Sequence, residues 1–307
     1  MSKDNQNEQA EDFSDDELII RRKKAPEQKT DVTAANVLKI AADALGALRA
    51  KKPLVQCMTN VVASNFTANA LLALGAAPAM VEDMGEASQF TKVADSLLVN
   101  VGTVTKPQAD AMRAAVSHAN MGGKPWVLDP VGVGALPLRT FTAKELMRRF
   151  PALIRGNASE INFLVNNEVS GRGVDTTVTS DDVAQSAARL AGVTHAAVLV
   201  TGETDYVAAE GAPLVAVANG SPLMARVTGL GCAQGAIAAA FLGTLGGKAR
   251  WESTLAAALV VAIAGEQAAV KAKGPGTFVP AFLDALDSLK PEDVLKLGKV
   301  KIVPVVG

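Results

Sequence analysis

The chain has 307 residues and a formal net charge of −1, and 49% of its residues are hydrophobic. A soluble α/β domain of about 250–300 residues can bury a full core, so a single domain is expected. The net charge is near neutral, whereas proteins that bind nucleic acid usually carry an excess of basic residues. Aromatic residues make up only 4% of the chain, too few for a base-stacking surface.

Residues 1–30 are predicted to be a disordered charged tail. The acidic run at 11–17 is followed by the basic run at 21–24, and such a segment buries too little apolar surface to offset its chain entropy. Docking of the basic run on an acidic partner is the alternative. The polar start does not resemble a signal peptide, and two cysteines without disulfide spacing favour a reducing cytoplasm. The folded domain is expected to span 31–307.

Beyond the tail, the hydrophobic pattern predicts alternating helices and strands. A first helix begins near Asp31, with apolar residues at helical spacing up to Leu48. Further helices are predicted over 65–74, 108–120, 159–165 and 181–190, and near 232–245, 251–272 and 279–289. Strands are predicted over 97–101, 125–128, 152–154 and 196–201, followed by a hairpin of 206–209 and 214–218. This alternation indicates βαβ units and a largely parallel sheet.

Two apolar stretches, 236–245 and 255–264, are the strongest candidates for membrane segments. Each is shorter than the ~20 residues that a membrane span requires. Both are therefore predicted to be buried helices, and no membrane partner is expected.

A glycine-rich turn at Thr228–Gly235 opens the alanine-rich helix near 232–245. Such a turn leaves backbone N–H groups unpaired at a helix N-terminus, which makes an anion site suited to phosphate. Cys232 lies at this helix start, where a lowered thiol pKa would allow it to accept a proton from a substrate hydroxyl. A small buried thiol beside a structural turn is the alternative interpretation.

The same turn invites a rival interpretation as a dinucleotide-binding loop, since Gly229, Gly231 and Gly235 follow a GxGxxxG pattern. The GxGxxG form fails because position 234 is Gln, and the turn lies in the last third of the chain. An oxidoreductase is therefore disfavoured. No GxxxxGK[ST] loop and no GxSxG elbow occurs.

Three further segments place polar residues after predicted strands. Asp129 ends one strand, where open α/β sheets bind ligands and where magnesium could take a carboxylate; an ordinary turn is equally plausible. Arg155 could grip a phosphate and Glu160 could hold metal. A capping box of Asn157 with Glu160 is nevertheless the favoured interpretation of that segment. Thr201 could offer its hydroxyl to a phosphate or simply begin a turn.

The two histidines, His118 and His195, have no carboxylate or cysteine at metal-ligand spacing. Both are expected to have structural or solvent-exposed roles.

In this order, these segments resemble the hydroxyethylthiazole kinase family of thiamine salvage, within the ribokinase-like enzymes. The resemblance runs from about residue 53 to residue 280. Its landmarks are Met58–Asn60, Ala68–Ala76, Leu128–Gly132, Pro137–Thr140, Arg155–Ile161, Val200–Glu203 and Pro222–Cys232.

The resemblance implies a ribokinase-like three-layer α/β sandwich with a largely parallel central sheet flanked by helices. It implies a cytoplasmic enzyme that phosphorylates the hydroxyl of 5-(2-hydroxyethyl)-4-methylthiazole with ATP and Mg²⁺. Family members are similar in forming trimers with sites between subunits, so a homotrimer is expected.

Site roles also follow from the resemblance. It implies that Cys232 is catalytic, at the position where related sugar kinases have an aspartate base. It places Arg155 and Thr201 at ATP, and Asp129 and Glu160 near magnesium.

The resemblance implies that Met80, Gly229 and Asn60 line the thiazole pocket. The chain departs from the family pattern at several positions, among them Leu230 in the anion-hole turn and Ala233–Gly235 after the cysteine.

Three other activities remain open on the same scaffold. A dehydratase that repairs hydrated nicotinamide cofactors would favour Asp at position 232, where this chain has Cys. A kinase for another small alcohol, such as a hydroxymethylpyrimidine, is a close neighbour. A nucleotide-sensing oligomer would bind ATP without turnover.

Overall fold

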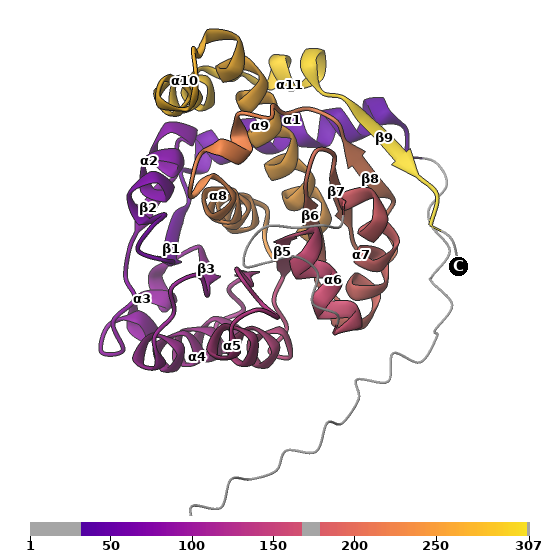
Figure 1. The fold of residues 1–307 in the computed structure, drawn as a ribbon. Helices are drawn as coiled ribbons and strands as arrows, with labels where there is room; N and C mark the ends of the chain where they lie inside the picture. Colours follow the sequence, from indigo (N-terminus) through magenta and orange to yellow (C-terminus); the bar gives the residue numbers. More distant parts are fainter. Residues whose placement is uncertain (1–31, 168–178, 306–307) are drawn as a thin grey trace, which may run out of the picture.

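The computed structural model describes residues 32–167 and 179–305, so the predicted tail at 1–30 lies outside the described residues. The helices (Figure 1) are α1 (Ala34–Lys51), α2 (Ser64–Leu74), α3 (Ala87–Val93), α4 (Lys106–Met121), α5 (Pro137–Met147), α6 (Ala158–Asn166), α7 (Ser180–Thr194), α8 (Leu230–Leu245), α9 (Arg250–Lys271), α10 (Pro275–Ser288) and α11 (Pro291–Leu297). The strands are β1 (Leu54–Met58), β2 (Ala77–Ala79), β3 (Ser96–Asn100), β4 (Trp126–Asp129), β5 (Leu153–Asn157), β6 (Ala197–Thr201), β7 (Asp205–Ala208), β8 (Leu214–Val217) and β9 (Val300–Val303).

The strands form one nine-stranded sheet in the order β2-β1-β3-β4-β5-β6-β7-β8-β9. The pairs from β2 to β6 are all parallel, and β7, β8 and β9 add antiparallel strands beyond β6. Because parallel strands end at the same edge, the loops that follow β1, β3, β4, β5 and β6 converge.

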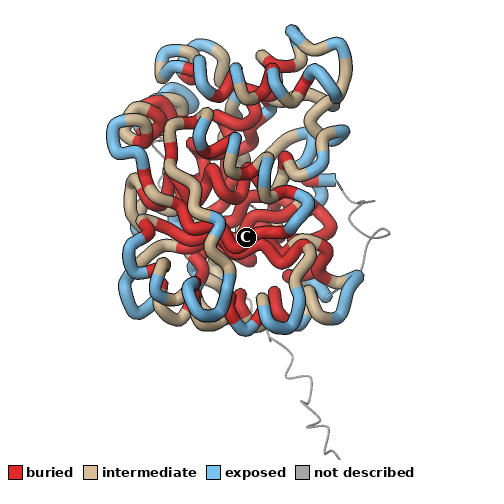
Figure 2. Tube along the Cα trace, turned by 90° about the vertical axis from the view of Figure 1, so that its left-hand side faces the viewer, coloured by how far each residue is buried: buried red, intermediate tan, exposed pale blue. Residues whose placement is uncertain are grey.

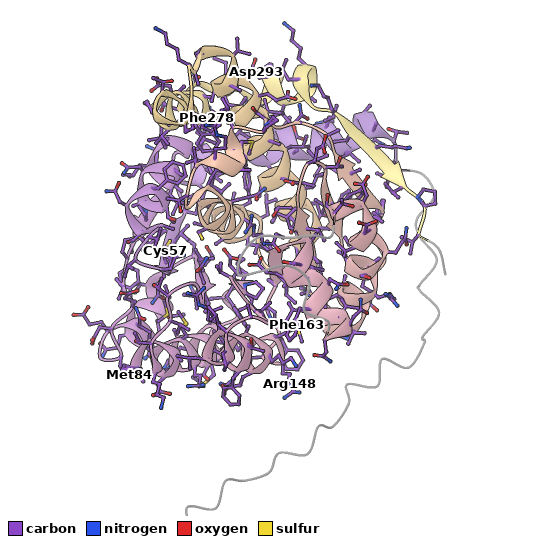
Figure 3. The ribbon with its side chains drawn as sticks, in the orientation of Figure 1. Cys57, Met84, Arg148, Phe163, Phe278 and Asp293 are labelled. Carbon is purple, nitrogen blue, oxygen red and sulfur yellow. The ribbon has the colours of Figure 1, made fainter. Side chains whose placement is uncertain are left out.

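Helices cover both faces of the sheet, which makes three layers. Residues of α1, α2, α8, α9, α10 and α11 form one apolar core with the sheet, and residues of α3 to α7 form the other. Phe278 lies in the first core and Phe163 in the second, on opposite sides of the sheet (Figure 3). Figure 2 shows the buried chain concentrated between these layers and the exposed chain at the outer helix surfaces. The predicted three-layer α/β sandwich is confirmed.

The strands between the two helix layers are apolar on both faces, as expected for buried parallel strands. In β3, Leu98 packs in the first core, while Leu97 and Val99 pack in the second. Side chains alternate along a strand, so a continuous apolar run serves both layers.

The helix α1 packs against elements from the far end of the chain. It contacts α8, α9 and α11 and also meets β9, the last strand. Val37, Leu45 and Leu48 of α1 are completely buried in this contact.

Every helix and strand named by the hydrophobic pattern is present, with ends shifted by a few residues. Elements without a strong pattern were missed: β1, β2, α3, α5, α11 and β9. The apolar stretch 255–264 lies within α9, which matches the helix predicted near 251–272. α9 has 22 residues and could cross a membrane by length and composition alone, but 78% of its apolar window is buried inside the protein. α9 packs in the first core, so the prediction of a buried helix is confirmed.

Candidate active site

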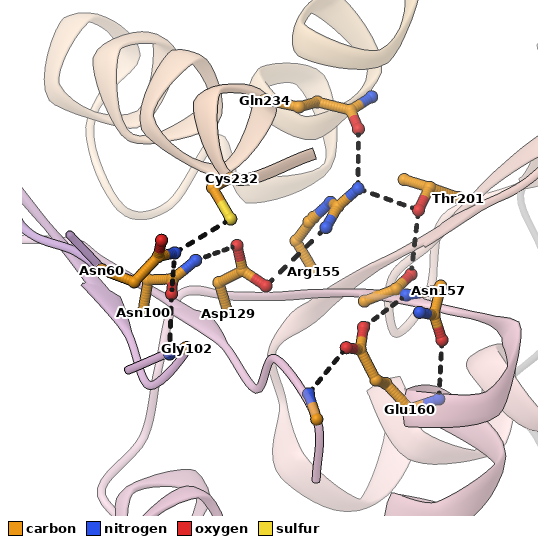
Figure 4. Close-up of polar contacts among 12 residues, drawn as sticks. Asn60, Asn100, Gly102, Asp129, Arg155, Asn157, Glu160, Thr201, Cys232 and Gln234 are labelled. Carbon is orange, nitrogen blue, oxygen red and sulfur yellow. Dashed lines mark hydrogen bonds and ion pairs between the residues drawn. The ribbon is translucent and has the colours of Figure 1, made fainter. Parts of the chain in front are cut away.

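Polar side chains gather at the carboxyl ends of the parallel strands, opposite the N-terminus of α8 (Figure 4). The loop after β1 brings one of them, and the others belong to β3, β4, β5 and β6. In chain order they are Asn60, Asn100, Asp129, Arg155 and Thr201. Five segments that are distant in sequence therefore meet at one site.

The glycine-rich turn forms the predicted helix start. Gly229 has φ +81° as the N-cap of α8, and no side chain caps the helix. The first helical bond runs from the Ala233 N–H to the Gly229 carbonyl, at 2.9 Å. A Cβ on Gly229 would lie 3.2 Å from the Ala63 Cα, so glycine is required there by both backbone angle and space. The N–H groups of residues 230–232 precede the first helical hydrogen bond, and unpaired N–H groups at a helix start are suited to binding an anion.

The Arg155 guanidinium lies against this turn. Its Nη2 donates to Thr201 Oγ1 at 3.0 Å and to Gln234 Oε1 at 3.3 Å. A Cβ on Gly231 would come within 2.7 Å of Nη2, so the close approach of arginine and helix start depends on that glycine. Nη1 lies 3.7 Å from Asp129 Oδ1. Arg155 is 7% exposed and thus brings a buried positive charge to the anion site.

Asp129 is a fully buried carboxylate in the centre of the sheet edge. Its Oδ2 accepts a 2.6 Å hydrogen bond from Asn100 Nδ2, whereas Oδ1 accepts none within the described part of the chain. Burial raises the pKa of Asp129 from 3.8 to about 7, and the attraction of Arg155 only partly opposes that rise. The carboxylate therefore keeps an acceptor atom for a ligand.

The predicted thiolate at Cys232 is wrong for the free enzyme. Burial, together with the negative charge of Asp129, raises the pKa of Cys232 to about 11, and Arg155 and the hydrogen bond from Asn60 do not reverse this. The helix start favours the thiolate, but loss of water around sulfur outweighs it. Cys232 Sγ accepts a 3.2 Å hydrogen bond from Asn60 Nδ2, so the neutral thiol is held in the polar cluster.

Glu160 forms the capping box that its position favoured. Its Oε2 accepts from the Asn157 N–H at 2.8 Å, and Asn157 Oδ1 accepts from the Glu160 N–H at 2.9 Å. Its Oε1 accepts from the Gly132 N–H at 2.9 Å, and burial raises the pKa of Glu160 despite these bonds. Glu160 therefore connects the start of α6 to the loop that follows Asp129, the last residue of β4.

Asp129 and Glu160 together offer the kind of donor atoms that magnesium binds. Asp129 Oδ1 is buried without a hydrogen bond, and each Glu160 oxygen accepts a backbone N–H, which leaves it a further lone pair. Within residues 32–167 and 179–305, no group of three or more His, Cys, Asp or Glu could hold a metal by itself. One or two carboxylates completed by phosphate and water are what Mg²⁺ commonly takes, so the donor set fits.

A model of the hydroxyethylthiazole kinase family matches residues 45–292. The chain is 50% identical over 247 residues to hydroxyethylthiazole kinase from Tolumonas auensis, with 80% of this chain and 92% of that protein covered. It is 54% identical over 239 residues to hydroxyethylthiazole kinase from Klebsiella pneumoniae, covering 78% of this chain and 91% of that one. The chain belongs to the hydroxyethylthiazole kinase family.

Solved structures agree with the family. A hydroxyethylthiazole kinase protein from Pyrococcus horikoshii superposes with a TM-score of 0.79 at 36% identity, covering 87% of this chain and 100% of that one. Pyridoxal kinase from Staphylococcus aureus, solved with ADP, has a TM-score of 0.53 at 14% identity over 70% of this chain and 88% of its own, a likeness of fold alone. The chain is therefore a kinase of the ribokinase-like fold, and the oxidoreductase alternative falls.

Not every residue implied by the family resemblance lies in the polar cluster. Met80 follows β2 at the edge of the sheet and is 36% exposed.

His118 lies on α4, bonded to the Ala114 carbonyl at 3.0 Å, and His195 pairs with Glu210 at 2.6 Å on the surface. The histidines have the structural and solvent roles expected of them.

Hydroxyethylthiazole kinase motifs did not point to three residues that the structure adds to the site. Asn100 bonds both Asp129 and Asn60, and Gln234 and Asp205 extend the network behind Arg155. A polar residue that ends an apolar strand was the available signal for Asn100. A lone glutamine within an apolar helix was the signal for Gln234.

Proposed function

We propose that this kinase transfers the γ-phosphoryl group of ATP to the hydroxyl of 5-(2-hydroxyethyl)-4-methylthiazole, giving the thiazole phosphate and ADP in thiamine salvage and biosynthesis. The observation that carries the proposal is the open N-terminus of α8 between a buried arginine and a partly buried thiol. An anion site with a cation on one side and a polar pocket on the other suits a phosphoryl group passing from nucleotide to alcohol. Family membership supports the acceptor.

In this proposal the nucleotide lies on the Arg155 side. Phosphoryl transfer needs positioning and charge neutralisation more than covalent help. The N–H groups of residues 230–232 receive the charge that develops on the γ-phosphoryl oxygens, and Arg155 binds the β- and γ-phosphates beside Thr201. Asp129 and Glu160 would hold Mg²⁺, which when bound offsets phosphate charge. The low exposure of these groups strengthens each electrostatic contact.

The acceptor alcohol lies on the Cys232 side, between Asn60 and Gly229. Because the thiol is neutral at assay pH, we propose that Cys232 orients the hydroxyl and guides its proton as the P–O bond forms. The hydroxyl oxygen gains the phosphoryl group, its proton is released, and ADP leaves with the electrons of the broken bond. A loose transition state requires no early deprotonation of the alcohol.

A homotrimer is proposed to complete the acceptor side. Met80 directly follows β2, the edge strand, and large hydrophobic residues are exposed on the segments next to β1 and β2 in the chain: Val61, Val62, Leu72, Met84 and Val93. Burial of such a patch by a second copy would close the pocket over the thiazole. Light scattering after size-exclusion chromatography measures the mass, and a monomer at micromolar concentration contradicts the trimer.

We propose that residues from about 31 onward act as one kinase domain, since all the strands β1 to β9 belong to one nine-stranded sheet. The cytoplasm is proposed as its location because Cys57 and Cys232 are both free thiols.

The function is tested by ADP release in a coupled assay with Mg-ATP. The thiazole alcohol is compared with hydroxymethylpyrimidine and with no acceptor. Release that depends on the thiazole supports the proposal. Release that depends on the pyrimidine, or ATP binding without release, contradicts the acceptor or the turnover respectively.

A further inference from the structure

Gln234 is a buried polar side chain that the reaction above does not use. It lies on α8 at 3% exposure and is followed by the fully buried Ala236–Leu242. An amide in such surroundings is costly unless both its ends are hydrogen-bonded. Both ends are bonded here: Oε1 accepts from Arg155 Nη2 at 3.3 Å, and Nε2 donates to Asp205 Oδ2 at 3.2 Å.

The direction of this chain of hydrogen bonds is fixed by chemistry. Arginine only donates and an ionised carboxylate only accepts, so the Gln234 amide can satisfy both partners in one orientation alone. Asp205 is itself held by the Gly202 N–H, which donates to Oδ1 at 3.0 Å. Burial raises the pKa of Asp205 to about 6, so it is ionised at pH 8. Asp205 therefore sets the amide, and the amide oxygen sets Nη2 of Arg155.

Arg155 needs this restraint because a competing partner is close. Its Nη1 lies 3.7 Å from Asp129 Oδ1, too far for a hydrogen bond, and its Nε has no hydrogen bond in the described part of the chain. If Gln234 released Nη2, the Thr201 hydroxyl would be left to hold it. The guanidinium would then turn toward the Asp129 carboxylate and away from the anion site.

We propose that Asp205 and Gln234 are positioning residues: they hold the Arg155 guanidinium at the start of α8, where it binds the terminal phosphates of ATP. The inference rests on the proposed role of Arg155 at ATP. It adds a route by which two residues act on the nucleotide through Arg155, without contact with the nucleotide being required.

Nucleotide binding by calorimetry at pH 8, with Mg²⁺, tests the inference. The probes are β,γ-methylene-ATP and AMP, and the variants are Gln234→Met and Asp205→Asn. Binding of β,γ-methylene-ATP is expected to weaken about tenfold in each variant, equivalent to about 1.4 kcal/mol. Binding of AMP, which lacks the terminal phosphates, is expected to stay within about twofold, and the matched control Gln89→Met, an exposed glutamine on α3, is expected to bind both as the parent does.

A double variant separates positioning from general loss of packing. Asp205→Asn turns an amide N–H toward Gln234, which must then flip and face Arg155 with a second donor. In Asp205→Asn/Gln234→Glu, the new carboxylate at position 234 accepts both from the new amide at position 205 and from Arg155, so every bond of the chain is restored. Binding of β,γ-methylene-ATP is expected to return to within about threefold of the parent, a coupling that independent sites do not show.

These results distinguish failure of the positioning inference from failure of the proposed thiazole kinase function. Equal loss of AMP and β,γ-methylene-ATP binding, or no recovery in the double variant, overturns positioning through Arg155. Unchanged binding in Arg155→Met overturns the nucleotide role of Arg155 and the inference with it. A parent that binds β,γ-methylene-ATP, shows the predicted variant pattern and fails to phosphorylate the thiazole leaves the inference standing and overturns the proposed acceptor.

Discussion

Replacing Asp129 by asparagine should make the protein more stable at neutral pH while impairing the enzyme. Burial raises the pKa of Asp129 from 3.8 to about 7, so ionising this carboxyl is harder in the folded protein than in the unfolded chain. Each pKa unit corresponds to about 1.36 kcal/mol, so a rise of about 3 units gives a penalty of about 4 kcal/mol at pH 8. An asparagine at this position would keep the shape of the side chain without this charge.

The direction in which stability changes with pH follows from proton linkage. Between about pH 4 and pH 7 the folded protein binds a proton at Asp129 that the unfolded chain has lost, so parent stability falls as pH rises. The Asp129→Asn variant lacks this dependence. The difference in unfolding free energy, variant minus parent, should therefore grow by about 4 kcal/mol from pH 4 to pH 8.

Urea denaturation of both proteins at pH 4.5, 6 and 8, in a chelator, measures this difference. A difference that stays constant with pH, or that shrinks as pH rises, would refute the argument that this carboxylate is buried at the expense of stability. Thiazole phosphorylation by the variant should fall by at least about tenfold, as for losses of metal-site partners. An active, more stable variant would remove Asp129 from the proposed mechanism.

Three further substitutions probe the same site. Cys232→Ser should lower kcat about tenfold with KM for the thiazole within about twofold, and kcat should vary with pH from 6 to 9 as in the parent, because the Cys232 thiol, with its pKa near 11, does not ionise there. Gly229→Ala should lower the free energy of unfolding by about 1–2 kcal/mol in urea titrations, because φ is positive and the Ala63 backbone is close. Asn100→Leu should lower it by about 1–3 kcal/mol, because Asp129 Oδ2 loses the amide that donates to it.

A Cys232→Ser enzyme with parental kcat would leave the thiol without a role in the proton's path. Parental stability of Gly229→Ala would show that the turn relaxes, and parental stability of Asn100→Leu would show that water replaces the amide.

Sequence patterns predicted the elements that are determined by neighbouring residues in the chain. The helix predicted over 65–74 ends at Leu74 as expected, and Gly75 with φ +100° caps it. The strand β1 was missed because Gln56 interrupts its apolar run. In the structure Gln56 is fully buried, and its amide donates to the carbonyls of Val81 and Ala87, which ties the start of α3 to the sheet. Such a partner is visible only after folding.

The same limit applies to the site. The helix start could be predicted from the glycines, but the protonation state of Cys232 could not, because the sequence does not show how much water reaches the sulfur. In the sequence, Gln234 was one of several departures from the family pattern, within the run Ala233–Gly235. Its meaning depends on Arg155 and Asp205, which lie 79 and 29 residues away along the chain.

The contact between α1 and the last elements has a consequence for synthesis on the ribosome. Roughly 200 residues separate the end of α1 from the start of α9, which at about 5–20 residues per second take about 10–40 s to translate. During that time the apolar face of α1, with Val37, Leu45 and Leu48, has no partner from α9 or α11. A nascent chain of this kinase therefore exposes the apolar face of α1 early. We expect this exposed helix to bind chaperones that act near the ribosomal exit.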